Sequence, residues 1–289
     1  MAAAALALTA ADATGGARLR KVVGDVEVSF GSSSSWRAAQ VGDVLAPGAA
    51  LRTAAGARAE IELAGGVARI YEQSLARIPD GRDAARRVDL ERGASSFDIE
   101  PRSDAPFEVH TPNAVALVKG TRFTVTSDAG GSTVAVQRGL VGVREPGSVA
   151  REILVHPGFG VTGGAGRPFA LGLLDQKGDP WEAWSRGAAP SRPLPPPPEA
   201  DLPPASPDTG GTEVLLQGEP NVSIRVLAPR GDKRIQVIGT SGLDKTLTKH
   251  DLDQVLRGNS AVLGSELLAM LHSRGVTPPA FAHQVLDNL

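Results

Sequence analysis

The sequence predicts a mainly β protein, in which an all-β module is followed by a small α+β domain. Three observations support this. Apolar and polar residues alternate in short runs through the first half of the chain, and glycines interrupt these runs at spacings of about ten residues. A proline-rich segment then separates these runs from a region with helical periodicity. With 41% apolar residues and a mean hydropathy of −0.08, the 289-residue chain can bury a core.

Residues 1–17 are predicted to be a signal-like or disordered amino terminus. They contain a short apolar run and an Ala11-x-Ala13 sequence typical of the cleavage end of a secretory signal, without a positively charged start. The run is far shorter than the roughly 20 residues that a spanning helix needs. We therefore expect export to the periplasm or cell envelope and no transmembrane helix in this chain. If translation starts further upstream, the membrane topology of the protein remains open.

Residues 18–165 are predicted to form strands throughout. Their apolar residues recur at alternate positions, in the sets Ala57, Ala59, Ile61 and Leu63; Phe107 and Val109; Phe123 and Val125; Val134 and Val136; and Val141 and Val143. Half-buried strands of this kind form a sandwich, a barrel or a solenoid, and the pattern does not choose between them. Only Asp83 to Arg87 leaves room for a helical turn.

Residues 166–212 are predicted to be a tryptophan-containing segment followed by a linker. Nine of the eighteen residues from Pro190 to Pro207 are proline, which favours an extended polyproline spacer. Before the spacer, Trp181 and Trp184 lie at helical spacing. They are expected either to cap the open end of the β module or to form an exposed anchor for a partner.

Residues 213–289 are predicted to form the small α+β domain. Two strand-like runs, Val222 to Leu227 and Arg234 to Ile238, come before three helices. The first helix begins at Thr248, where Asp251 three residues later completes a capping box. The second covers Val262 to Arg274, and the third begins at Thr277 with a proline at its first position. This domain is expected to pack on the β module or to bind a strand or helix of a partner.

Composition excludes several kinds of chemistry. Cysteine is absent, which removes disulfides, thiol nucleophiles and cysteine metal sites. Thirty basic against 32 acidic side chains argue against nucleic acid as a partner. The five histidines show no metal-binding or catalytic spacing, and the Gly-x-Gly-x-x-Gly of Gly158 to Gly163 is not followed by a helix start, so it predicts a strand and turn. We expect no enzymatic activity, no cofactor and no metal.

Nine segments of the β module resemble the FecR domain family in order and spacing. Together they extend over about 140 residues, and the succession Phe-x-Val-x-Thr-Pro, Gly-Thr-x-Phe-x-Val and Gly-x-Val is the most specific part. The segments are Gly24–Val28, Val41–Leu45, Gly48, Leu51–Thr53, Val88–Gly93, Phe107–Ala114, Val118–Val125, Thr133–Val141 and Val155–Gly158.

The FecR resemblance implies an extracytoplasmic all-β module. Proteins of this family sense a loaded outer-membrane transporter and signal through a spanning helix to a cytoplasmic sigma factor. This sequence departs from that plan, since no spanning helix precedes Arg18 and residues 213–289 do not read as the family's βαβ receptor-contacting module. The expected function is therefore that of a non-enzymatic envelope protein that binds a protein or cell-wall partner in sensing or signalling.

Candidate partner-binding residues are Trp181, Trp184, Asn113, Lys119 and Arg122, from the tryptophan segment and from two loops of the β module. Three alternatives remain open. The β module could assemble with copies of itself, the chain could be a FecR-type sigma-factor regulator with a longer amino terminus, or scattered acidic residues could form a hydrolase site. The oligomeric state is not predicted.

Overall fold

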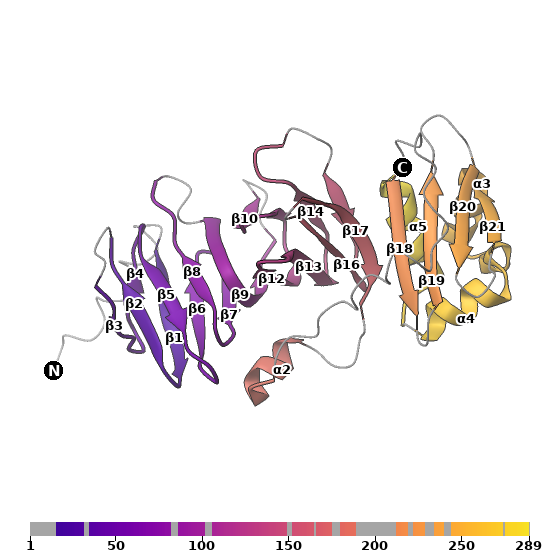
Figure 1. Cartoon of the computed structure of the whole chain (residues 1–289). Helices are drawn as coiled ribbons and strands as arrows, with labels where there is room; N and C mark the ends of the chain where they lie inside the picture. The colour runs from indigo at the N-terminus through magenta and orange to yellow at the C-terminus, as the bar shows by residue number, and fades with distance from the viewer. Residues whose placement is uncertain are drawn as a thin grey trace.

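Two long β-sheets face each other around a shared apolar core and extend along one axis of the molecule (Figure 1). The computed structural model describes residues 16–31, 35–81, 86–101, 106–148, 152–164, 166–174, 180–188, 212–218, 222–228, 234–239, 244–273 and 275–288. The candidate helical turn at Asp83 to Arg87 falls mostly outside these residues, and Arg87 itself begins a strand.

Sheet A is antiparallel through its first nine strands. In spatial order these are β4 (Val44–Leu45), β1 (Ala17–Val23), β6 (Arg58–Leu63), β7 (Gly66–Ile70), β9 (Arg87–Ile99), β12 (Arg122–Asp128), β13 (Gly131–Arg138), β16 (Phe159–Gly164) and β17 (Arg167–Leu173). The predicted module boundary at residue 165 falls between β16 and β17, which pair with each other.

Sheet B lies opposite and shares β9 with sheet A. Its order is β3 (Arg37–Ala38), β2 (Val26–Ser29), β5 (Ala50–Thr53), β8 (Leu75–Arg77), β9, β10 (Phe107–His110), β11 (Val115–Val118), β14 (Val141–Arg144) and β15 (Ile153–Val155). All pairs are antiparallel except β9–β10. The chain alternates between the sheets as it advances, so the module packs as a sandwich and is wound in the manner of a solenoid.

The long strand β9 crosses from one sheet to the other at Gly93. Before this glycine the strand pairs with β8 and β10 of sheet B, and after it with β7 and β12 of sheet A. Gly93 has φ +93°, and a Cβ there would lie 2.5 Å from the Cα of Ser74. Only glycine fits this bend, because it combines a left-handed backbone with a close approach of β9 to its neighbour.

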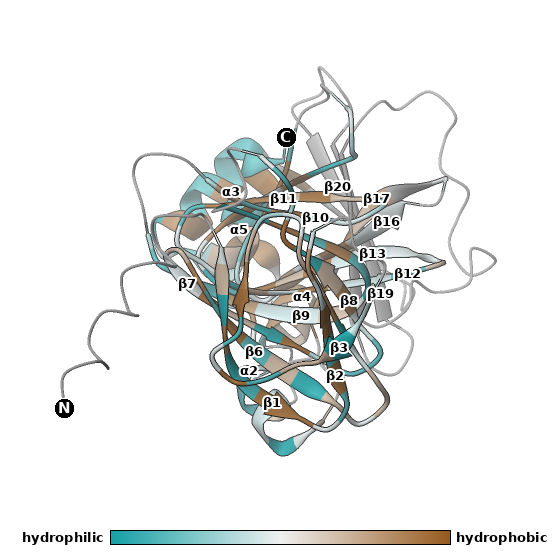
Figure 2. Cartoon of the chain, turned by 90° about the vertical axis from the view of Figure 1, so that its left-hand side faces the viewer, coloured by the Kyte–Doolittle hydropathy of each residue, from teal (hydrophilic) through white to brown (hydrophobic). Residues whose placement is uncertain are grey.

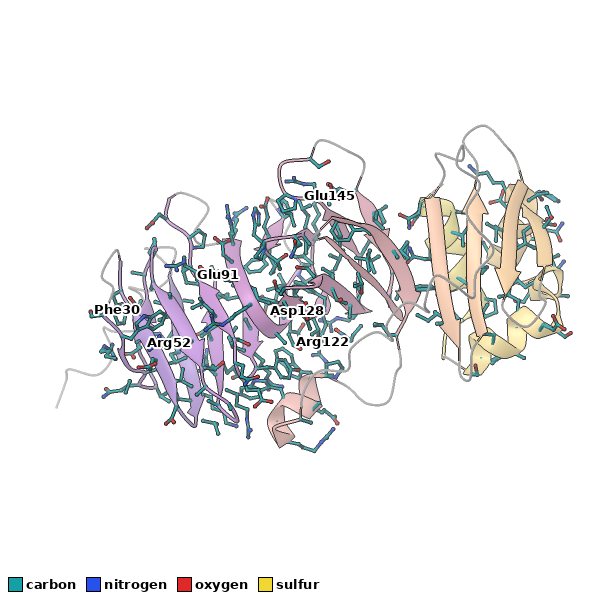
Figure 3. The ribbon with its side chains drawn as sticks, in the orientation of Figure 1. Phe30, Arg52, Glu91, Arg122, Asp128 and Glu145 are labelled. Carbon is teal, nitrogen blue, oxygen red and sulfur yellow. The ribbon has the colours of Figure 1, made fainter. Side chains whose placement is uncertain are left out.

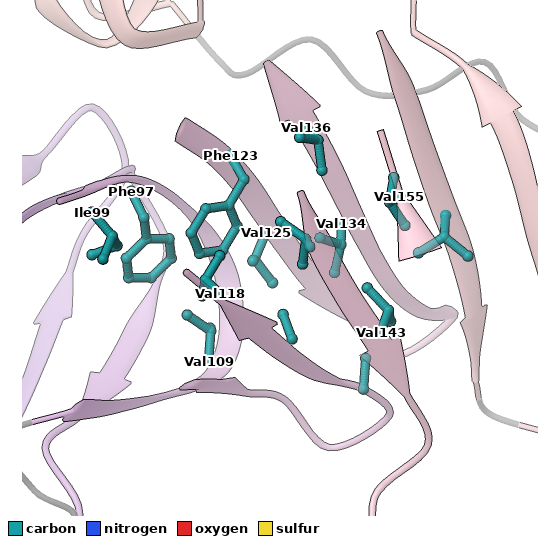
Figure 4. Close-up of a cluster of buried hydrophobic side chains, with 14 of the residues drawn as sticks. Phe97, Ile99, Val109, Val118, Phe123, Val125, Val134, Val136, Val143 and Val155 are labelled. Atoms are coloured by element: carbon teal, nitrogen blue, oxygen red, sulfur yellow. The ribbon is translucent and has the colours of Figure 1, made fainter. Parts of the chain in front are cut away.

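The apolar alternation predicted from the sequence is confirmed, because the alternating residues point into the space between the sheets. Figure 4 shows a cluster in which Phe97, Phe123 and valines of both sheets meet. The rings of Phe97 and Phe123 stack with centroids 5.0 Å apart, and Phe107 of sheet B lies 6.1 Å from Phe97. Hydrophilic residues alternate with these along strands such as β6 (Figure 2). Outside the core they form ion pairs such as Arg77–Glu91 at 2.9 Å.

The carboxy-terminal α+β unit continues both layers of the sandwich. Its strands β18 (Thr212–Gly218), β19 (Val222–Ala228), β20 (Arg234–Gly239) and β21 (Asp244–Thr248) extend sheet A beyond β17. Its helices α3 (Lys249–Leu256), η3 (Ser260–Leu263), α4 (Ser265–Ser273) and α5 (Pro278–Asp287) take the place of sheet B, and their buried residues join the shared core. The unit therefore packs on the β module, one of the two expected arrangements.

Two of the three predicted helices begin where their capping residues indicated. Thr248 and Asp251 form the capping box of α3, and Thr277 caps α5 ahead of its proline. The predicted helix from Val262 to Arg274 is wrong in its first turn, because Gly264 adopts φ +77° and separates η3 from α4. Strands β18 and β21 were not predicted.

Helix α5 covers the edge of sheet B with two side-chain amides. Gln284 accepts a hydrogen bond from the backbone N–H of His156 at 2.9 Å and donates to the carbonyl of Leu154 at 2.8 Å. Asn288 accepts from the N–H of Leu154 at 3.0 Å. These amides satisfy the backbone of β15 as a neighbouring strand would, and so protect an otherwise open edge.

Substitution of Gln284 by alanine is therefore expected to lower the free energy of unfolding by about 1–3 kcal/mol. The N–H of His156 loses its partner, and the carbonyl of Leu154 keeps only its bond from Asn288. Urea unfolding followed by circular dichroism measures this. The control is Gln254→Ala, whose side chain bonds to His250 on the surface of α3 and should change stability by less than about 0.5 kcal/mol. Equal losses of unfolding free energy in Gln284→Ala and Gln254→Ala would show that the Gln284 amide does not stabilise the docking of α5.

Candidate functional site

A short helix, α2 (Pro180–Arg186), lies against the outer face of sheet A, below the sandwich in Figure 1. Three side chains, two from the sheet and one from the residue after β7, donate hydrogen bonds to its backbone carbonyls. The Tyr71 hydroxyl donates to Pro180 at 2.7 Å, Arg69 Nη1 to Trp181 at 2.6 Å, and Arg58 Nη2 to Ser185 at 3.5 Å. A seven-residue helix has little stability alone, so these contacts and its tryptophans hold it in place.

Trp184 is the buried anchor of α2. Its side chain is 1% exposed and packs in a small cluster with Tyr71 and Ala94. Its indole Nε1 donates to the carbonyl of Ile70 at 2.9 Å, and the Arg69 guanidinium lies 4.9 Å from its ring centroid. Docked in this way, Trp184 binds the protein's own sheet face. It does not lie at an open end of the β module, and it is not an exposed anchor on the outer surface.

Trp181 and Arg122 come together beside this anchor. The guanidinium of Arg69 lies 3.9 Å from the Trp181 ring centroid and that of Arg122 5.3 Å from it. Arg122 and Arg138 both form ion pairs with Asp98, which fixes the cations on the sheet face (Arg122 is labelled in Figure 3). Three of the five candidate residues, Trp181, Trp184 and Arg122, therefore share one site.

Asn113 and Lys119 lie in the turns at the two ends of β11. Asn113 is half-buried in the turn after β10, where Thr111 bonds to the backbone of Ala114, and its Cγ would lie 2.9 Å from a Cβ placed at Gly164. Lys119 is exposed in the turn that leads to β12. Neither residue lines the cavity described next.

A cavity of about 400 Å³ opens beside the carboxy-terminal end of α2. Its floor is the cluster of Tyr71, Ala94 and Trp184, and its wall includes the β9 bend at Gly93. Four charged residues, Arg58, Glu72, Arg92 and Asp128, line it as well (Asp128 is labelled in Figure 3). This size falls in the range of small-ligand sites.

Sequence reasoning missed Arg58, Arg69 and Tyr71, which make the site. The period-two pattern places Arg58 on the outer face of β6, where a charged residue needs no explanation. Nothing in the pattern indicates that a helix more than a hundred residues later in the chain docks there. Within the ranges that the structure describes, no three His, Asp or Glu side chains gather as a metal site.

Residues 49–142 match a protein family described as FecR protein. The FecR resemblance is thus confirmed for the segment from β5 into β14, which contains Arg58, Arg69, Tyr71 and Arg122 but not α2. The search of curated proteins found no match. Among the described residues, no helix has the length and apolar character needed to span a membrane.

Two similar solved structures are crystal structures of a "putative anti-sigma factor" from Parabacteroides distasonis ATCC 8503. Each is 22% identical to this chain, covers 48% of it and has a TM-score of 0.41. The match spans 65% and 64% of the two solved chains, which is less than two thirds of their length.

Proposed function

We propose that this chain is a non-enzymatic, exported protein of the cell envelope that takes part in signalling by binding a protein or cell-wall partner. The FecR match of residues 49–142 is the observation that carries the proposal. The description of the two solved relatives as an anti-sigma factor agrees with a regulatory role. No cofactor enters the proposal.

The surface that we assign to the partner is formed jointly by α2 and the FecR segment. We define the α2 surface as Trp181, Glu182, Arg186, Arg122 and Arg138. Glu182 and Arg186 project from the helix with side chains that are 70% and 63% exposed, and Trp181 offers part of its ring between them and the sheet. Tryptophan and arginine are among the residue types most enriched at binding hot spots.

Fractionation of cells that make the native, untagged protein tests the location. We expect the protein in the envelope fraction, with an intact mass that shows cleavage near Ala13. An untrimmed protein in the cytoplasmic fraction would contradict the proposal.

Site-specific photo-crosslinking in the same cells tests the surface. A photoreactive phenylalanine analogue at Glu182 is expected to yield an adduct of defined mass. The same analogue at Glu145, an exposed glutamate in the turn after β14 (labelled in Figure 3), should yield none. Equal yields at both positions would argue against the α2 surface.

A further inference from the structure

The cavity beside α2 contains two arginines that lack a carboxylate partner. Other arginines on the outer face of sheet A are paired, such as Arg69 with Glu60 at 2.8 Å and Arg122 with Asp98. In the part of the chain that the structure describes, Arg58 and Arg92 form no such pair, and both line the cavity. The cavity therefore holds two guanidinium groups that make no ion pair, although two carboxylates also line it.

Arg58 also carries an unsatisfied buried donor. Its Nε is one of two buried side-chain polar atoms without a hydrogen-bond partner among the described residues, and its Nη2 makes only the 3.5 Å contact with Ser185. Buried donors are almost always satisfied, so an orphaned one calls for an explanation. Because Nε itself is closed to solvent, the Nη groups of this guanidinium are the donors that an anion in the cavity would meet.

The two acidic residues of the cavity are already engaged with turn amides. Glu72 accepts from the N–H of Gly56 at 2.6 Å, and Asp128 accepts from the N–H of Gly130 at 2.8 Å. Each carboxylate thus accepts a hydrogen bond from a turn amide, while the two guanidinium groups have donors that no carboxylate uses. The unused guanidinium donors therefore favour a ligand group that accepts hydrogen bonds in pairs, such as a carboxylate.

The floor of the cavity indicates what the anionic group is attached to. It consists of the buried Ala94, Trp184 and Tyr71. The small residues Ala57 and Gly93 line the cavity around it. Small residues around an aromatic floor leave space for a small apolar side chain. A planar carboxylate beside a methyl-sized group matches the guanidinium pair and this floor together.

We propose that this cavity binds the free carboxyl end of a peptide that terminates in small apolar residues. Arg58 and Arg92 hold the carboxylate, and the floor of Ala94 and Trp184 contacts the last side chain. The proposal rests on the proposed partner-binding function and adds a peptide site next to the α2 surface. Such an end can belong to a protein, with an L-residue, or to a cell-wall peptide, with a D-residue.

Calorimetric titration of the full chain with four probes tests this. The probes are N-acetyl-L-Ala-L-Ala, N-acetyl-D-Ala-D-Ala and the carboxy-terminal amide of each. We expect saturable binding of at least one acid, and at least about tenfold weaker binding of its amide, because the amide removes the charge that the guanidinium groups pair with. Preference for the L- or the D-acid identifies the source, and equal binding of both still supports the carboxylate site.

Arg58→Gln and Arg92→Gln are each expected to weaken binding of the acid by about tenfold or more. The control is Arg77→Gln, on the outer face of sheet B, which should leave binding unchanged. Arg92 is exposed, so its variant decides the question if Arg58→Gln does not fold. Absence of saturable binding by either acid, equal binding of acid and amide, or no effect of Arg92→Gln would overturn the proposal. None of these results would alter the envelope location tested by fractionation.

Discussion

Substitution of Phe97 by alanine is expected to destabilise the β module by about 3–5 kcal/mol. Phe97 is fully buried on the part of β9 that follows the bend at Gly93. Its ring stacks on Phe123 of sheet A and contacts Phe107 of sheet B, so it fills the space where the two sheets meet. Removal of the ring leaves a cavity that rigid strands on both sides cannot close.

Urea unfolding followed by far-ultraviolet circular dichroism measures this loss. The matched control is Phe30→Ala, because Phe30 is 36% exposed and contacts the Arg37 guanidinium at 4.8 Å at the surface. Its substitution should change the free energy of unfolding by less than about 1 kcal/mol. Similar losses in the two variants would show that the core is not organised around β9.

The strand content of the β module was predictable because its burial has a period of two. Strands such as β6 and β10 bury one residue in two, as the alternation of Ile61 and Val109 with polar neighbours indicated. The crossing of β9 was not predictable. The pattern predicts that glycines separate one strand from the next, whereas Gly93 bends a single thirteen-residue strand from one sheet into the other.

Contacts between distant parts of the chain also could not be predicted from the sequence. The capping residues of α3 and α5 are local signals and located both helices, but the docking of α5 on β15 depends on amides that look like ordinary surface residues in the sequence. The same reason applies to the candidate site. Its tryptophans were noticed as a pair, while their partner Arg69 lies more than a hundred residues earlier.

Substitution of Trp184 by alanine is expected to release α2 from sheet A. The change removes the buried indole and its hydrogen bond to Ile70, which together should contribute about 3–5 kcal/mol to docking. Because a helix of seven residues is not stable by itself, release should also unfold it. Hydrogen–deuterium exchange of a peptide covering residues 180–188 measures this, since the amides of Gly187 and Ala188 are bonded within the docked segment.

Trp181→Ala is the matched control, because it removes an aromatic side chain from the same helix without removing its anchor. The ring of Trp181 is only partly buried, and the hydrogen bond from Arg69 goes to its backbone carbonyl, which alanine retains. We expect α2 to stay protected from exchange in this variant. If residues 180–188 lost protection in Trp181→Ala but kept it in Trp184→Ala, Trp181 and not Trp184 would be the anchor.

The response of the rest of the chain to Trp184→Ala distinguishes two roles for α2. If exchange rises only in residues 180–188, the helix is a separately docked element, and its release removes one wall of the cavity and abolishes peptide binding while the FecR segment stays folded. If exchange rises throughout β7 and β9 as well, α2 belongs to the cooperative core. The first result is expected, because Trp184 contacts the outer face of sheet A and takes no part in the cluster between the sheets.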